Sequence, residues 1–435
     1  MSSGEVQLQP VRGDPEQGYR LHKNLPRADD EQLAENNGRW ATIGGDCPAL
    51  RDYLAPKEGT CWALCKLLVS FVRGFSQTGF ANNPITGIIL MVGLVSTAPG
   101  TFLVCSATGF LGHLISMSLQ EPSVNVDNGL TVFNPLIFGA VSYYFVPVVY
   151  GGFDGFSSLL MLLGVIFIAY FWRACGNGGI PCLTMPFNVA ELILLFTLKN
   201  AADSRAILST VRNASSSSLD NAGAIAAEAG SLVVENATTH VNASPDWGMV
   251  VQASLASASQ LFVTESLAFG ALVYLAVLVY SPITCFFGYL GSLGASLVAL
   301  LLGAPHQQIR AGLWGFNGYL TAASLGGSFL VMNGQVAAAT CVAIVLTALL
   351  QHVLQIIFVP TGLPVGTMPF VLTTWLFIGL GNSSEGLFNY PITMSSPEGQ
   401  RQELLTRRKT AKLEQRAEAA EPLEILLQNG KSSSA

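Results

Sequence analysis

Charged residues are scarce in this chain. Asp, Glu, Lys and Arg make up 11% of its 435 residues, which is less than half of the roughly 25% usual in soluble domains. Residues 248–392 contain only three of them, Glu265, Arg310 and Glu385. Half of the chain is hydrophobic, and hydrocarbon tolerates few ionised side chains. The composition therefore excludes a soluble multidomain protein and predicts an all-α polytopic membrane protein within a lipid bilayer.

Features that several functional classes require are also missing. The eight cysteines are scattered, and neither a CxxC pair nor a Cys/His metal-ligand spacing occurs, so we expect no metal and no cofactor. No cluster of Lys and Arg with interleaved aromatics is present, which argues against a nucleic-acid partner. The first 59 residues lack the apolar core of a secretory signal peptide, so we expect them to form a tail.

One motif occurs twice. Residues 179–187 read GIPCLTMPF and residues 362–370 read GLPVGTMPF, with Thr184 and Thr367 placed 183 residues apart. The same step relates six further pairs: Gln77 and Gln260, Gly87 and Gly270, Pro99 and Pro282, Gly129 and Gly312, Phe133 and Phe316, and Asn134 and Asn317. An ungapped series of this length predicts an internal duplication.

The apolar runs divide the chain into five parts. These are an N-terminal tail (1–59), a first transmembrane repeat (60–199), an extracellular linker rich in Ser and Asn (200–247), a second transmembrane repeat (248–381) and a charged C-terminal tail (382–435). Each repeat has room for about five membrane-spanning helices of roughly 20 residues plus a half-membrane re-entrant helix. Pro99-Gly100 is the natural division of the first long run.

Charge and glycosylation signals predict how the repeats are oriented. Each tail carries seven Lys or Arg, and the positive-inside rule places such segments in the cytoplasm. The linker contains three glycosylation sequons, at Asn213, Asn236 and Asn242, which must face the exterior. Each repeat then crosses the membrane an odd number of times, and the two repeats are inverted relative to each other. Such repeats place the substrate site near the bilayer midplane, where broken helices meet.

The duplicated motif carries the candidate site. Proline lacks an N–H donor, so each motif should leave backbone acceptors unpaired; the prolines concerned are Pro181, Pro186, Pro364 and Pro369. Unpaired backbone is tolerated at membrane depth only if it is buried in protein or lines a wet cavity. Two copies at symmetric positions favour Thr184 and Thr367 as pore-lining residues over kinked helices whose threonines bond to their own backbone.

Paired amides flank the motifs in both repeats. Gln77 and Gln260 each precede a predicted turn into an apolar run and can both donate and accept hydrogen bonds. They are candidates for substrate contact or for bonds between helices. We expect Asn134 and Asn317 to support a helix break rather than to touch substrate.

Less symmetric residues complete the candidate set. Phe80 and its counterpart Val263 could form an apolar constriction or serve only in packing. Glu265 is the one carboxylate deep in the second repeat, and an intramembrane acid is a functional candidate, so we place it among the substrate-binding residues.

A second acid lies beyond the first motif. Thr184, Asn188 and Glu191 are spaced i, i+4 and i+7, on one helical stripe. A proton relay through Glu191 or Glu265 stays open, although neither acid has an acidic counterpart in the other repeat. A lining of carbonyl and hydroxyl oxygens without a ring of like charges suits a neutral polar solute such as a small amide.

These motifs together resemble those of the urea transporters. The resemblance rests on Ser76-Gln77 followed by NNPITG at residues 82–87, on GLWGFN at 312–317, and above all on the twin PxxTxPF motifs, and it covers roughly residues 59–380. The chain departs from the family pattern at residues 264–270, where the Asn-Pro pair is absent, and at Glu191.

The resemblance implies a homotrimer in the plasma membrane, with a pore in each protomer that passes urea down its gradient without ion coupling. It implies that Gln77, Gln260, Thr184 and Thr367 contact urea from half-membrane helices and oxygen ladders. It also implies that Phe80 and Val263 line two narrow apolar slots.

Two other classes of function remain open at this point. One is proton-coupled transport, or transport of a broader set of small polar solutes that includes amides, ammonia and water. The other is an intramembrane enzyme that uses Glu191 or Glu265 as acid or base, against which no His or second carboxylate lies at a useful spacing from either.

Overall fold

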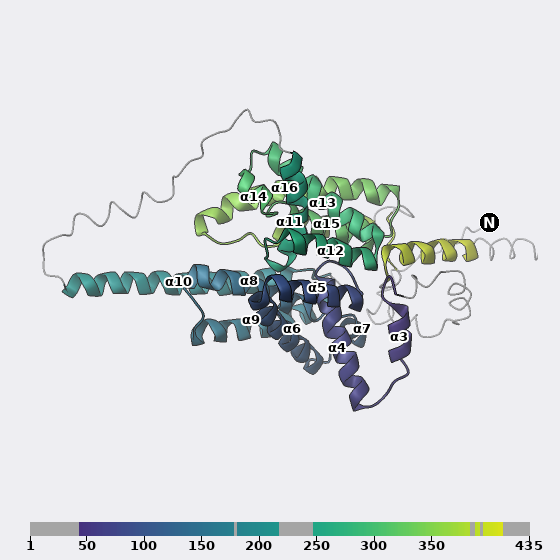
Figure 1. The fold of residues 1–435 in the computed structure, drawn as a ribbon, viewed down its shortest axis with the longest axis horizontal. Coiled ribbons are helices and arrows are strands. Elements are labelled where there is room, and N and C mark those ends of the chain that lie inside the picture. Colours follow the sequence, from purple (N-terminus) through teal and green to yellow (C-terminus); the bar gives the residue numbers. More distant parts are fainter. Residues whose placement is uncertain (1–42, 178–180, 217–246, 383–387, 392–394, 412–435) are drawn as a thin grey trace, which may run out of the picture.

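The computed structural model describes residues 43–177, 181–216, 247–382, 388–391 and 395–411 (Figure 1). All regular secondary structure in these residues is helical, as the composition predicts, and they contain no strand. The first repeat and the second repeat form two adjacent bundles, drawn in purple to teal and in shades of green in Figure 1.

In the described residues 43–177 and 181–216, eight helices make up the first bundle and the segment before it. They are α3 (Pro48–Leu54), α4 (Thr60–Gln77), α5 (Pro84–Thr97), α6 (Pro99–Ser118), α7 (Ser123–Asp127), α8 (Phe133–Tyr150), α9 (Gly155–Asn177) and α10 (Met185–Ser216).

The second bundle contains α-helices joined by short 3₁₀ and π turns. They are α11 (Trp247–Ser259), η3 (Gln260–Phe262), α12 (Leu267–Tyr280), α13 (Pro282–Leu301), α14 (His306–Arg310), α15 (Gly315–Ala323), η4 (Ser324–Ser328), α16 (Gly334–Phe358), η5 (Val359–Thr361), α17 (Met368–Ile378) and η6 (Gly379–Asn382).

The duplication is visible in the helix bounds. Helices α5, α6 and α7 begin and end 183 residues before α12, α13 and α14, and α10 begins 183 residues before α17. Close backbone contacts repeat as well. A Cβ added to Gly87 would lie 2.1 Å from the carbonyl oxygen of Val72, and one added to Gly270 would lie 2.0 Å from that of Leu255. Only glycine permits this approach of two helices in either half.

Prolines and polar caps explain where the helices start. Pro84 and Pro99 stand in the first turns of α5 and α6, where a missing N–H costs nothing, and Ala98 separates these helices at the predicted division. The Asn83 side chain caps α5 by accepting from the next backbone N–H groups. Its counterpart Ser266 caps α12 by accepting from the N–H of Phe269, so the second half keeps the cap although it has lost the Asn-Pro pair.

Five of the described helices are long and apolar enough to cross a membrane: α6, α8, α9, α13 and α16. Residues 247–262 and α12 pass the same test as a pair, bent by 80° at a short break. The break, residues 263–266, follows the 3₁₀ turn η3 that begins at Gln260, whereas α4 ends at Gln77 itself. The prediction of about five crossings in each half remains a prediction.

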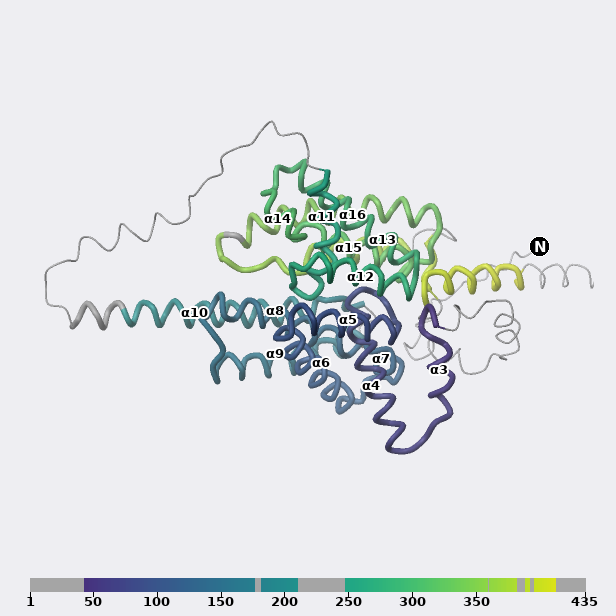
Figure 2. The backbone as a smooth tube through the Cα atoms, viewed as in Figure 1, coloured from purple at the N-terminus to yellow at the C-terminus, as the bar shows by residue number. Residues whose placement is uncertain are grey.

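Helix α10 continues beyond the first bundle into the predicted linker. It runs past Lys199 to Ser216 and projects away from the other helices (Figure 2). Arg205 fastens its outer part to the end of α8, with its guanidinium carbon 4.6 Å from the ring centroid of Tyr150 and a nitrogen 3.7 Å from Asp154 Oδ2. Asn213 lies on this helical extension, whereas the other two sequons, at Asn236 and Asn242, lie outside the described residues.

The two terminal segments meet at the corner between α12 and α13. The N–H of Gly45 donates to the carbonyl of Tyr280 at 3.0 Å. From the other end of the chain, Glu398 Oε1 accepts from the hydroxyl of Ser281 and from the N–H of Ile283, both at 2.9 Å. Glu398 therefore caps the N-terminus of α13, where a carboxylate is electrostatically favoured.

Candidate functional site

The two copies of the duplicated motif touch each other. Thr184 precedes α10 and Thr367 precedes α17, and their hydroxyl oxygens lie 2.5 Å apart. Both residues are buried, with exposed fractions of 5% and 7%. The hydroxyl pair therefore joins the two repeats at one point between the bundles.

The motif prolines begin helices rather than kink them. Pro186 and Pro369 stand one residue after the first residues of α10 and α17, where the N–H of a helix has no internal partner. The expectation of a free acceptor is wrong at one position: the carbonyl of Cys182, four residues before Pro186, accepts from the N–H of Met185 at 3.0 Å. The carbonyl of Pro181 likewise accepts from Trp375 Nε1 at 2.7 Å.

Two asparagines hold the motif loops in equivalent ways. Asn134 Nδ2 donates to the carbonyl of Leu183 at 2.9 Å, and Asn317 Nδ2 donates to the carbonyl of Gly366 at 3.2 Å. Both carbonyls immediately precede a site threonine. Leu183 and Gly366 adopt left-handed conformations, with φ of 51° and 65°. Each asparagine thus binds the backbone at the left-handed turn of its loop, and the structural-support role stays a prediction.

Asn188 adds a clamp that only the first repeat has. Its Nδ2 donates to the carbonyl of Thr184 at 2.9 Å and to the hydroxyl of Thr367 at 2.8 Å. Its Oδ1 accepts from the N–H of Thr367 at 2.9 Å. A Cβ on Gly366 would lie 2.5 Å from that Oδ1, so the clamp depends on a glycine there. The residue equivalent to Asn188 in the second half is Val371.

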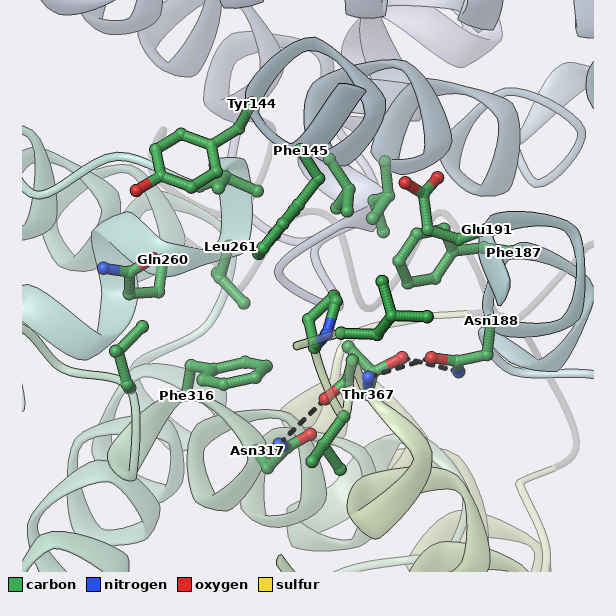
Figure 3. A pocket seen from close by; sticks show the side chains of 18 of the residues that line it. Tyr144, Phe145, Phe187, Asn188, Glu191, Gln260, Leu261, Phe316, Asn317 and Thr367 are labelled. Carbon is green, nitrogen blue, oxygen red and sulfur yellow. Dashed lines mark hydrogen bonds between the residues drawn. The ribbon is translucent and has the colours of Figure 1, made fainter. Parts of the chain in front are cut away.

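A cavity of about 460 Å³ opens on the Thr367 side of the threonine pair (Figure 3). Helices α8 and α10 of the first bundle form one wall, and η3, α15, α16 and the loop at residues 362–367 form the other. Most of the lining is aliphatic and aromatic. The polar side chains that line it are Thr78, Asn188, Glu191, Gln260, Glu265, Gln308, Asn317, Gln351, Gln355 and Thr367.

The cavity contains four of the seven side chains predicted to bind substrate, namely Gln260, Val263, Glu265 and Thr367. The other three, Gln77, Phe80 and Thr184, do not line it. Thr184 is nevertheless in contact with Thr367, while Gln77 and Phe80 belong to the end of α4 and the turn after it.

The two glutamines are anchored alike. Gln77 Nε2 donates to the carbonyl of Asn128, and Gln260 Nε2 donates to the carbonyl of Ala311, each at 2.8 Å. In the described part of the chain no hydrogen bond reaches the Oε1 of either amide. Each glutamine is thus oriented through its nitrogen, and its oxygen remains an acceptor for a solute N–H.

Phe80 and Val263 follow the glutamines in strained conformations. Their φ angles are 61° and 55°, in the left-handed region that bulky and β-branched residues rarely adopt. The Phe80 ring lies at an angle to Phe370 and Phe329, with centroids 5.8 and 6.1 Å away. Backbone strain of this kind clusters at functional sites, and here it turns one apolar side chain inward beside each glutamine.

The two acids differ in environment. Glu265 is exposed at the edge of the cavity. Glu191 is only 4% exposed, and its Oε2 accepts a hydrogen bond from the hydroxyl of Ser142 at 2.9 Å. The described residues contain no group of His, Cys, Asp and Glu arranged to hold a metal ion.

Sequence reasoning missed part of this site. The helical stripe placed Asn188 beside Thr184, but nothing in the stripe indicated that its amide crosses to the opposite repeat. Gln351 was also missed; it accepts from Asn317 Nδ2 at 3.0 Å and donates to the carbonyl of Leu313 at 2.7 Å. The glutamines within the apolar run of α16, Gln335, Gln351 and Gln355, were the available signal.

Comparison with known proteins identifies the family. A family model described as "Urea transporter" matches residues 68–382. The chain belongs to the urea transporter family. Urea transporter 1 of Ovis aries is 26% identical over 345 residues, covering 76% of this chain and 81% of the relative. Urea transporter 1 of Mus musculus is 23% identical over 366 residues, covering 81% and 85%.

Membership in the urea transporter family confirms the resemblance seen in the sequence. The matched residues include both motifs, both glutamines and every residue of the threonine clamp. The family consists of transporters, so the intramembrane-enzyme hypothesis is wrong, and the chain is a multi-pass membrane protein.

Proposed function

We propose that this chain is a passive channel for urea, with a permeation path through the cavity, past the Thr184–Thr367 pair and on toward Phe80 and Gln77. The observation that carries the proposal is the contact between the two motif threonines at the end of a mostly apolar cavity. Membership in the urea transporter family and the names of the curated relatives support urea as the solute.

The chemistry of the path matches a small planar amide. Urea has four N–H donors and one carbonyl acceptor, so it needs mainly oxygen acceptors. The Oε1 of Gln260, the Oδ1 of Asn317 and the hydroxyl of Thr367 supply them along the cavity, and Asn317 Oδ1 is buried without a partner in the described structure. Flat apolar side chains such as Phe316 complete the wall. The N–H groups of urea therefore exchange hydrogen bonds with water for bonds to these oxygen atoms, while the two faces of the planar molecule contact apolar side chains.

The topology belongs to the same proposal. We propose that the two repeats are inverted, that Gln77 and Gln260 end half-membrane helices, and that three protomers assemble in the plasma membrane with both tails in the cytoplasm. The repeated helix bounds and the meeting of both terminal segments at one corner support this arrangement. Glycans at Asn213, Asn236 and Asn242 would then mark the outer face.

Flux measurements on the full chain in proteoliposomes test the function. In stopped-flow shrinkage assays we expect urea entry far above that of protein-free vesicles, saturating with urea concentration and indifferent to an imposed pH gradient. Uphill urea accumulation driven by a proton gradient would refute the passive mechanism and favour proton-coupled transport. Entry no faster than in protein-free vesicles would refute urea transport itself.

A further inference from the structure

The charged side chains that line the cavity are both acidic. Two carboxylates, Glu191 and Glu265, line it, and among the described residues of its wall there is no Lys, Arg or His. No described basic side chain forms an ion pair with either acid. A neutral solute such as urea does not require this excess of negative charge.

Glu191 lies in the wall of this cavity, and one of its two carboxylate oxygens has no hydrogen-bond partner in the described structure. Its Oε2 accepts from Ser142, but its Oε1 is buried and has no hydrogen-bond partner in the described structure. A buried carboxylate without a cation is costly, and an acid at membrane depth marks a site by default. The repeat does not require it, because the equivalent position in the second half is Thr374.

Aromatic rings surround the same space. Tyr144, Phe145, Phe187 and Phe316 line the cavity, and in the view of Figure 3 Phe145 lies above the open space and Phe316 below it, with Glu191 to one side. The faces of aromatic rings attract cations, most effectively where water is excluded. A carboxylate can accept hydrogen bonds from N–H donors at the rim of a planar cation, while aromatic rings contact the faces of that cation.

We propose that the cavity is a binding site for planar guanidinium or amidinium cations, which Glu191 holds through Oε1 and the aromatic side chains hold through their faces. Glu265, exposed at the edge, attracts such cations toward the cavity. Thr367 lines the same cavity, so a cation bound there blocks the proposed path of urea. This inference rests on the proposed function for its blocking effect, but the binding itself does not depend on urea transport.

Two measurements on the purified full chain test the site. The first is inhibition of urea flux in proteoliposomes by guanidinium chloride at concentrations far below those that unfold proteins, with tetramethylammonium chloride as the ionic control. The second is direct binding of radiolabelled guanidinium in detergent. We expect guanidinium, and not tetramethylammonium, to bind and to inhibit.

Variants separate the carboxylate from general effects of charge. Glu191→Gln should raise the half-inhibitory concentration of guanidinium, measured against that variant's own urea flux, by at least about tenfold, as expected for loss of a charge-assisted hydrogen bond. Glu58→Gln removes the same charge from an exposed position before α4 and should leave both flux and inhibition unchanged. Ser142→Ala keeps the carboxylate and removes only the hydrogen bond to Oε2, so inhibition should be retained, with a smaller rise in the half-inhibitory concentration than in Glu191→Gln.

The outcomes distinguish the two proposals. Urea flux without guanidinium binding, equal inhibition of wild type and Glu191→Gln, or the full loss of inhibition in Ser142→Ala would each overturn the cation site while leaving urea transport standing. Glu191-dependent binding of guanidinium by a chain that does not pass urea would refute the proposed function and support the cation site. If Glu191→Gln loses its fold, as judged by size-exclusion profile, Ser142→Ala and wild-type binding decide alone.

Discussion

Replacing Thr367 by valine removes the hydroxyl on which the two repeats converge. In the structure this oxygen lies 2.5 Å from the hydroxyl of Thr184 and accepts from Asn188 Nδ2 at 2.8 Å. Valine keeps the shape of the side chain but leaves the hydroxyl of Thr184 buried without its partner, which costs about 1–3 kcal/mol. It also removes an acceptor that a urea N–H would use at this point of the path.

The size of the effect on transport follows from these contacts. Because about 1.4 kcal/mol corresponds to a tenfold change, we expect urea permeability of Thr367→Val to fall about 10- to 100-fold in stopped-flow assays. Thr184→Val should cause a similar loss. The double variant should be scarcely worse than either single variant, because both changes remove the same bond and contacting residues couple in a double-mutant cycle.

Thr197→Val is the matched control. Thr197 lies on α10, is exposed, and donates its hydroxyl only to the carbonyl of Ile193 in its own helix, at 2.7 Å. This variant should transport urea at the wild-type rate. Wild-type flux in Thr367→Val, or losses in the two single variants that multiply fully in the double variant, would refute the role of the threonine pair.

Three further changes test the framework of the site by thermal unfolding in detergent, each against wild type. Gly366→Ala should lower the free energy of unfolding by about 2 kcal/mol and reduce urea flux. The added methyl would lie 2.5 Å from Asn188 Oδ1, and alanine is disfavoured at the left-handed φ of 65°. An unchanged melting temperature would contradict the clamp. Gly270→Ala should cost about 1–3 kcal/mol, because its methyl would meet a backbone carbonyl, and an equal or higher melting temperature would exclude that close approach. Glu398→Ala should lower the free energy of unfolding by about 1 kcal/mol, because α13 loses its cap. It should also raise the rate of hydrogen exchange at residues 395–411. An unchanged exchange rate there would mean that the cap does not hold the segment.

Much of the framework could be predicted because the two repeats share it. The 183-residue step paired Thr184 with Thr367 before any distance was known, and the proline positions marked several helix starts. The break after each glutamine followed from a polar stretch entering an apolar run. These features recur because the helices of both halves pack in the same way, and a pattern that occurs twice can be detected in a single sequence.

What the sequence could not predict lies where the repeats differ. Asn188 faces the other half only because the loops are folded against each other, and its counterpart Val371 gives no hint of the contact. The volume of the cavity beside Thr367 depends on how the helices of both halves pack against each other, which the sequence alone does not give. Helix α10 continues past Lys199 in a polar segment, where the composition that indicates membrane spans carries no information about helix length.

The shared corner of the two terminal segments has a practical consequence for labelling. Residues near Gly45 and Glu398 are fastened to adjacent positions, Tyr280 and Ile283, so the described ends of the chain emerge together on one face of the protein. A pair of fluorophores attached near these two segments would report a short, nearly constant distance whatever solute the protein transports. The same pair is therefore a reference for folding and for sidedness, and its separation would reveal the release of either tail from the bundle.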